Sequence, residues 1–214
     1  MAVSHVSFAL IWGTITVSAA LTVLAWRQRP EPGAIPFAAM MAAGTWWVVT
    51  SATGLFTLDR SRRLLLHSLE WVGPVLLPTA WLVFALEYTS RDEYVSRRTL
   101  GLLSIVPLLT LGLLATNDGH ALMYADRTVS QYGEISLVET VPGYWYWVFT
   151  IYAYTLLAVG TFHVVQMAAS SRSLYRGQAA ALLVTVFAPW VGNLIFVTDY
   201  LPVVLLVGQD FALT

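Results

Sequence analysis

The sequence contains no cysteine and no lysine among its 214 residues. Without cysteine, the chain can form no disulfide, thiolate metal site or cysteine nucleophile. Without lysine, it cannot form the Schiff base that would hold retinal in a rhodopsin. Charge is also scarce, because Asp, Glu, Lys and Arg together make up 11% of the chain, against roughly 25% in a typical soluble domain. The net charge of −1 gives no indication of nucleic-acid binding.

Apolar residues make up 57% of the chain and gather into long runs. A helix needs about 20 of them to cross the hydrocarbon core of a bilayer. We therefore predict an all-α polytopic membrane protein, a single transmembrane domain over 1–214 with six complete spans and the start of a seventh. The spans are expected at residues 6–26, 35–58, 64–89, 99–116, 144–169 and 177–197, with 201–214 leading into the seventh.

One long polar segment, residues 117–143, separates the fourth and fifth predicted spans. Residues 128–140 within it alternate loosely between polar and apolar around Tyr132-Gly133, a pattern typical of a β-hairpin. An irregular loop is equally compatible with the pattern.

Arginine counts favour an extracellular N-terminus. The loops after spans one, three and five hold two, three and two Arg, whereas those after spans two, four and six hold three, one and none. Cytoplasmic loops carry the excess of positive charge. We therefore predict a multi-pass protein of the cell membrane with its N-terminus and the 117–143 loop outside. The cluster of Arg60, Arg62 and Arg63 after the second span opposes this orientation.

Two ionisable side chains in the third predicted span are candidate ligand-binding residues. His67 and Glu70 lie three positions apart and so share one helical face. A charged side chain at mid-membrane costs about 2.5–3.5 kcal/mol and usually meets a partner or a water-filled cavity. The alternative is that both lie near the headgroups and pair with Arg62 or Arg63, since only six residues separate Leu64 from Glu70.

Aromatic side chains supply the rest of the predicted binding site. A pocket near the outer leaflet would be lined by Trp71, Trp147, Tyr154 and Trp190. An interfacial aromatic belt explains residues 144–147 without a ligand. Asn193 follows Pro189 by one turn in the sixth span. There it could contact the ligand, or it could only hydrogen-bond a neighbouring helix and stabilise the packing.

Catalytic signatures are missing from the sequence. It contains neither a His-Glu-x-x-His zinc motif nor a Gly-x-Ser-x-Gly nucleophile turn. We predict no catalytic residue, no metal ligand and no cofactor.

Short motifs in a fixed order extend over nearly the whole chain. They are Glu70-Trp71-Val72-Gly73-Pro74, residues 78–89, Ile105-Val106-Pro107, Thr116-Asn117 with His120, residues 143–147, 152–154 and 173–178, Pro189 with Asn193, and residues 210–214. In order and spacing, the set resembles the seven-helix sensor domain at the N-terminus of prokaryotic histidine kinases, with an archaeal source expected.

The resemblance implies the signal-input (sensor) module of a two-component histidine kinase, embedded in the lipid bilayer and acting as a homodimer. Its seventh helix would continue into a cytoplasmic PAS or kinase region, and its stimulus would be an unidentified small molecule or a change in the membrane. The chain lacks kinase motifs, so by itself it is expected not to be an enzyme. A small-solute transporter, which would show inverted repeats and broken helices at matching positions, and a structural membrane subunit remain alternatives.

Overall fold

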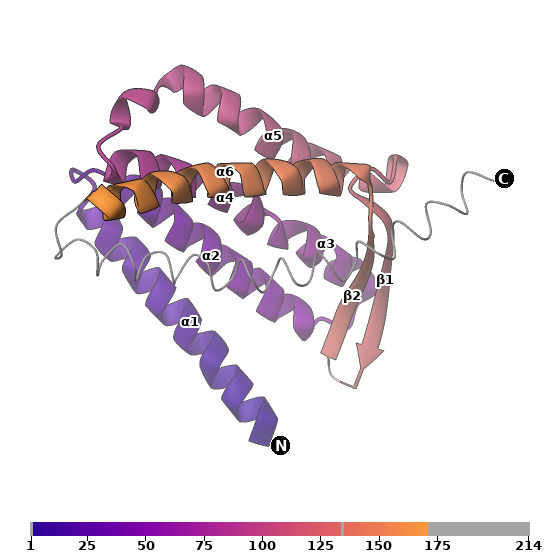
Figure 1. Ribbon diagram of the computed structural model, residues 1–214. Helices are drawn as coiled ribbons and strands as arrows, with labels where there is room; N and C mark the ends of the chain where they lie inside the picture. Colours follow the sequence, from indigo (N-terminus) through magenta and orange to yellow (C-terminus); the bar gives the residue numbers. More distant parts are fainter. Residues whose placement is uncertain (1, 134, 171–214) are drawn as a thin grey trace. The chain divides into compact units, whose positions relative to one another are not determined.

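The computed structural model describes residues 2–133 and 135–170, shown in Figure 1. In this chain, all contacts described below lie within Met1–His163. Its elements are α1 (Ala2–Arg27), α2 (Ala34–Leu55), α3 (Arg60–Glu70), α4 (Val72–Tyr88), the 3-10 turn η1 (Asp92–Tyr94), α5 (Arg97–Ala115), the 3-10 turn η2 (Asn117–Gly119), β1 (Tyr124–Tyr132), β2 (Ile135–Pro142) and α6 (Tyr144–Ser170).

Four of the described helical segments are long and apolar enough to cross a membrane. They are α2, α3 and α4 taken together, α5, and α6 as far as Ala169. These four correspond to the predicted spans 35–58, 64–89, 99–116 and 144–169. The predicted first span, 6–26, falls on helix α1, whereas 177–197 and 201–214 lie outside the described residues. The expectation of six spans and a seventh is therefore not confirmed as a whole.

The third predicted span, 64–89, falls on two consecutive helices that together are long enough to cross a membrane. Helix α3 ends at Glu70 and α4 begins at Val72. Pro74 has no N–H to donate to the Glu70 carbonyl, and its ring crowds that carbonyl, so the helix breaks there. The Trp46 indole N–H of α2 donates to the Leu69 carbonyl beside the break at 2.8 Å. An interrupted helix in a bilayer requires such a partner from a neighbour.

A second proline leaves one backbone carbonyl of α5 without its helical hydrogen-bond donor. Pro107 cannot donate to the carbonyl of Leu103, four residues earlier. The Tyr152 hydroxyl of α6 donates to that Leu103 carbonyl at 2.7 Å, and it also lies 3.2 Å from the Thr79 hydroxyl of α4. One phenol thereby links α4, α5 and α6.

Helix α2 is the central packing partner, with contacts to α1, α3 and α4, while α5 packs on α4. The crossing of α2 and α4 is close because Gly73 has no side chain. A Cβ at Gly73 would lie 2.8 Å from the Ala43 carbonyl oxygen and 2.7 Å from the Trp47 Cβ. Small residues let helix backbones approach in this way in membrane proteins.

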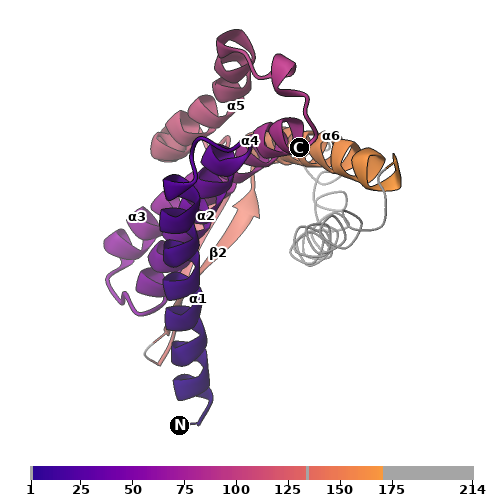
Figure 2. The same cartoon turned by 90° about the vertical axis from the view of Figure 1, so that its left-hand side faces the viewer.

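The predicted β-hairpin is confirmed and is longer than the 128–140 segment that predicted it. Strands β1 and β2 pair antiparallel, with Val129 opposite Val138 and Tyr132 opposite Ile135. Gly133 starts the turn at φ +65°, a conformation that glycine adopts without strain. Both strands contact α3, and β2 also contacts α2 (Figures 1 and 2). We call the end of the bundle where α2 and α5 end and α3 and α6 begin the hairpin end.

Candidate functional site

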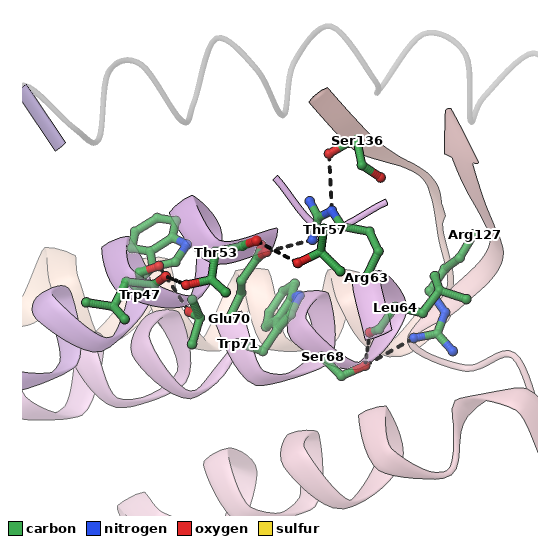
Figure 3. Close-up of polar contacts among 12 residues, drawn as sticks. Trp47, Thr53, Thr57, Arg63, Leu64, Ser68, Glu70, Trp71, Arg127 and Ser136 are labelled. Atoms are coloured by element: carbon green, nitrogen blue, oxygen red, sulfur yellow. Dashed lines mark hydrogen bonds and ion pairs between the residues drawn. The ribbon is translucent and has the colours of Figure 1, made fainter. Parts of the chain in front are cut away.

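A buried ion pair lies on α3 at the hairpin end (Figure 3). The Arg63 Nη1 donates to the Glu70 Oε1 at 2.9 Å, and the two side chains are 6% and 14% exposed. The Arg63 Nε–H also donates to the backbone carbonyl of Ser136 in β2 at 3.2 Å. We call Arg63, Glu70 and Ser136 the charged centre. Through one guanidinium it joins a membrane-spanning helix to the hairpin.

Helix α2 makes room for the charged centre at Gly54. A Cβ there would lie 2.6 Å from Nη1 of Arg63, 3.0 Å from its Cζ and 3.1 Å from Oε1 of Glu70. Any side chain at this position would therefore displace the ion pair. Because Gly54 has no side chain, Arg63 and Glu70 pack directly against the backbone of α2 and are largely shielded from solvent.

The alternative in which His67 and Glu70 both pair with Arg62 or Arg63 agrees with the structure for Glu70, which pairs with Arg63. His67 has different surroundings. The His67 ring lies 5.4 Å from the Tyr124 ring of β1. Its Nδ1 is buried and, like the hydroxyl of the fully buried Ser136, has no hydrogen-bond partner among the residues that the structure describes. The His67 Nδ1 and the Ser136 hydroxyl therefore retain hydrogen-bonding capacity.

Trp71, at the break between α3 and α4, is the middle of an aromatic cluster that we call the aromatic cap. Its ring centroid lies 6.1 Å from Tyr124, 5.9 Å from Tyr146 and 5.6 Å from Phe149. The indole N–H donates to the Tyr124 hydroxyl at 2.7 Å. Burial raises the pKa of that hydroxyl well above its ordinary value, so Tyr124 stays neutral at physiological pH.

Asn117 fixes the base of the hairpin with three hydrogen bonds. Its Oδ1 accepts from the backbone N–H groups of Met123 at 2.9 Å and Tyr124 at 3.0 Å, and its Nδ2 donates to the Tyr124 carbonyl at 3.0 Å. The side chain is 5% exposed. In the sequence, Asn117 is only one of the motif residues that carry the family resemblance, and no role was predicted for it.

A groove of about 570 Å³ opens between α3 and α5 on the hairpin side. Arg127 of β1 lies at its mouth, where it donates to the Ser68 hydroxyl at 3.2 Å and to the carboxylate of Asp118. This site was not predicted from the sequence, since the α3 residues of its wall lie about 50 or more positions from Asp118 and Arg127.

The predicted binding residues fall into three groups. His67, Glu70 and Trp71 gather around the charged centre and the aromatic cap. Trp147 lies beside the cap, with its ring 5.5 Å from that of Tyr146, and Tyr154 follows about two turns further along α6. Trp190 and Asn193 lie outside the described residues, so the pocket predicted from all seven stays a prediction.

One comparison with known proteins identifies a relationship. A family model described as the N-terminal 7TM region of histidine kinase matches residues 10–213. No curated protein and no solved structure matches the chain. The matched range contains every residue of the charged centre, the aromatic cap and the groove.

Proposed function

The chain belongs to the family of N-terminal 7TM regions of histidine kinases, and we propose that it is the signal-input module of a two-component system. The match over residues 10–213 supports the sensor class. The link from β2 through Arg63 to Glu70 supports a specific route for the signal, because it joins the hairpin to a membrane-spanning segment.

The proposed mechanism uses the break between α3 and α4 as the moving part. A stimulus that shifts the hairpin would pull on Arg63 and weaken its bond to Glu70, one residue before the break at Trp71. Such a shift requires two helix packings that bind the stimulus with different affinity. The break supplies a place where α3 can tilt without unfolding α4.

The same geometry bears on orientation. Arg63 is buried against Glu70, so it does not act as a free loop charge, and the arginine cluster after the second span opposes the predicted orientation less than the sequence alone implies. We propose, in line with the arginine counts, that the hairpin and the N-terminus lie outside the cell.

The stimulus site in this proposal is the region of His67, Glu70 and Trp71, extended by Trp147 and Tyr154. Trp190 and Asn193, which the sequence also predicts to bind, lie outside the described residues. The unsatisfied Nδ1 of His67 supports the assignment, because a buried polar atom without a partner costs free energy that a bound ligand could recover. The output in this proposal runs through a seventh helix to a cytoplasmic PAS or kinase region of a homodimer.

Kinase output tests the mechanism. Autophosphorylation should be measured in membrane vesicles with the chain joined to a histidine-kinase region. Glu70→Gln and Arg63→Met should each shift basal autophosphorylation, in the same direction, because both break the same pair. Arg62→Met, a change of the exposed neighbour, should leave it at the wild-type level. Equal output from all three variants would contradict the proposed route.

The gene itself offers a second test. Reading it past codon 214 should reveal a seventh apolar span followed by a helix with a phospho-acceptor histidine box. A stop codon directly after residue 214 would separate this chain from any kinase and contradict the proposal.

The break in the third span is also compatible with a transporter. Transporters have broken helices at corresponding positions of two repeats. The matching position would be near Pro189, which lies outside the described residues. Uptake of a labelled solute by vesicles that contain the chain alone would support the transporter over the sensor.

A further inference from the structure

The groove between α3 and α5 has the size of a ligand site. Its volume of about 570 Å³ falls within the roughly 300–1,000 Å³ typical of such sites. Its walls are apolar and come from Leu64, Leu65 and Leu69 of α3 and Leu111, Leu114 and Ala115 of α5. Helix α5 packs on α4, and the groove lies beside this contact, where residues of α3 and α5 face each other across it.

The groove changes character along its length. The apolar walls belong to α5 and to the combined segment of α3 and α4, both long and apolar enough to cross a membrane. The polar mouth is formed by Asp118 and Arg127, which follow the end of α5 at Ala115. The groove therefore extends from hydrocarbon depth to the level of the headgroups. A molecule that fills it needs an apolar tail and a polar head.

The Arg127 guanidinium at the mouth indicates which headgroup the molecule carries. The Arg127 side chain is 10% exposed, and it donates to a carboxylate on Asp118 that is itself 92% exposed. A guanidinium that already binds one oxyanion at the water boundary presents the donors that a phosphate accepts from. We propose that the groove binds a phospholipid of the surrounding bilayer, with an acyl chain between α3 and α5 and its phosphate at Arg127.

Lipid is the occupant that the location favours. Leu65 is 60% exposed on the wall of the groove, and in a bilayer the molecules that reach this surface are lipids. The proposal does not depend on an attached kinase, because it concerns only the chain and its membrane. The bound lipid would act on a second contact between α3 and the hairpin. That contact is the hydrogen bond from Arg127 to Ser68, which joins the same helix and hairpin as the charged centre.

Lipid retention by the purified chain tests the proposal. The chain is reconstituted into nanodiscs of phosphatidylglycerol, extracted into mild detergent and weighed by native mass spectrometry. The wild type should keep one lipid. Ala115→Trp, at an exposed position of the groove wall, should lose it, whereas Leu108→Trp, two turns earlier on the same face of α5 and outside the groove, should keep it. Equal retention by both variants would overturn the proposal.

The headgroup is tested by changing each side of the contact. Arg127→Gln should bind phosphatidylglycerol about five-fold less tightly, as expected for one basic contact at a membrane surface. Asp118→Asn should bind it more tightly, because a competing carboxylate is removed. The wild type should retain phosphatidylglycerol in preference to a galactosyl diacylglycerol with the same chains. If it retains the two lipids equally, or if Arg127→Gln has no effect, the phosphate contact is wrong.

A crosslink identifies the occupant directly. The chain has no cysteine, so Leu65→Cys provides a single thiol in the groove for a photoreactive label, and Leu102→Cys, 68% exposed on α5 and outside the groove, provides the control. After delipidation in detergent, the label at position 65 should still form a lipid adduct and the label at 102 should not. A crosslink from position 65 to residues 171–214, or to a second copy, would show that protein fills the groove and would overturn the proposal.

Discussion

The two ends of the helical bundle hold their polar groups in different ways. At the hairpin end, Arg63 and Asn117 are buried and bind backbone groups at the hairpin, and the Glu70 side chain is 14% exposed. At the opposite end, the Glu87 carboxylate accepts from the Gly33 N–H at 2.7 Å, and Arg91 lies 2.6 Å from His163, with these side chains partly exposed. The buried guanidinium and amide at the hairpin end are less accessible to water as a replacement partner, so we expect the two ends to respond differently to mutation.

The largest expected effect is at the charged centre. Glu70→Ala leaves Arg63 buried without its partner, and the free energy of unfolding should fall by about 3–5 kcal/mol. Unfolding by SDS in mixed micelles measures this. Arg62→Ala, at an exposed neighbour, should change stability by less than about 0.5 kcal/mol. A Glu70→Ala variant as stable as Arg62→Ala would show that the hairpin end is no more tightly held than the opposite end.

The pair can also be removed as a unit. Arg63→Met combined with Glu70→Leu should recover most of the stability lost in Glu70→Ala, because no unpaired charge remains buried. If the double variant is less stable than Glu70→Ala, the ion pair itself contributes the stability.

Asn117 should show the next largest effect. Asn117→Ala leaves the backbone N–H groups of Met123 and Tyr124 without an acceptor, at a cost of about 1–3 kcal/mol. Hydrogen exchange at these two amides should become faster, while Thr116→Ala, at an exposed neighbour, should leave their protection unchanged. Unchanged exchange in Asn117→Ala would mean that the hairpin base is held by other contacts.

A smaller effect is expected from the aromatic cap. Tyr124→Phe removes only the hydroxyl that accepts from Trp71, so about 1 kcal/mol should be lost. Because burial raises the pKa of Tyr124 in the folded protein, its contribution is complete below the unfolded pKa of about 10 and declines as the pH rises above it. The stability of the wild type should therefore fall more steeply above that pH than the stability of Tyr124→Phe.

The smallest effect is expected at the opposite end. Glu87→Ala should cost about 0.5–1.5 kcal/mol, because water can reach the Gly33 N–H. Glu87→Gln keeps an acceptor oxygen and should cost less than Glu87→Ala. If Glu87→Ala were as damaging as Glu70→Ala, the proposed contrast between the two ends would be wrong.

Several features could be predicted because they depend on local sequence. Apolar runs predicted the four spans that the structure describes, and alternation around Tyr132-Gly133 predicted the hairpin. The family could be identified from the order of short motifs. The sequence predicted the third span only by its bounds, and the end of α3 at Glu70 was not predicted, although the missing N–H of Pro74 is a local property.

The sequence by itself determined that this is a helical membrane protein, because length and apolarity of a run decide whether a segment can cross a bilayer. Tertiary structure decided which groups meet inside it. Glu70 could pair with Arg62 or Arg63 by spacing, and only the packing of α2 at Gly54 and of β2 at Ser136 selected Arg63. The groove likewise depends on tertiary structure, because its lining residues come from α3, α5 and β1, which are far apart in the sequence. A contact between distant segments depends on how the helices pack, and local sequence does not specify that.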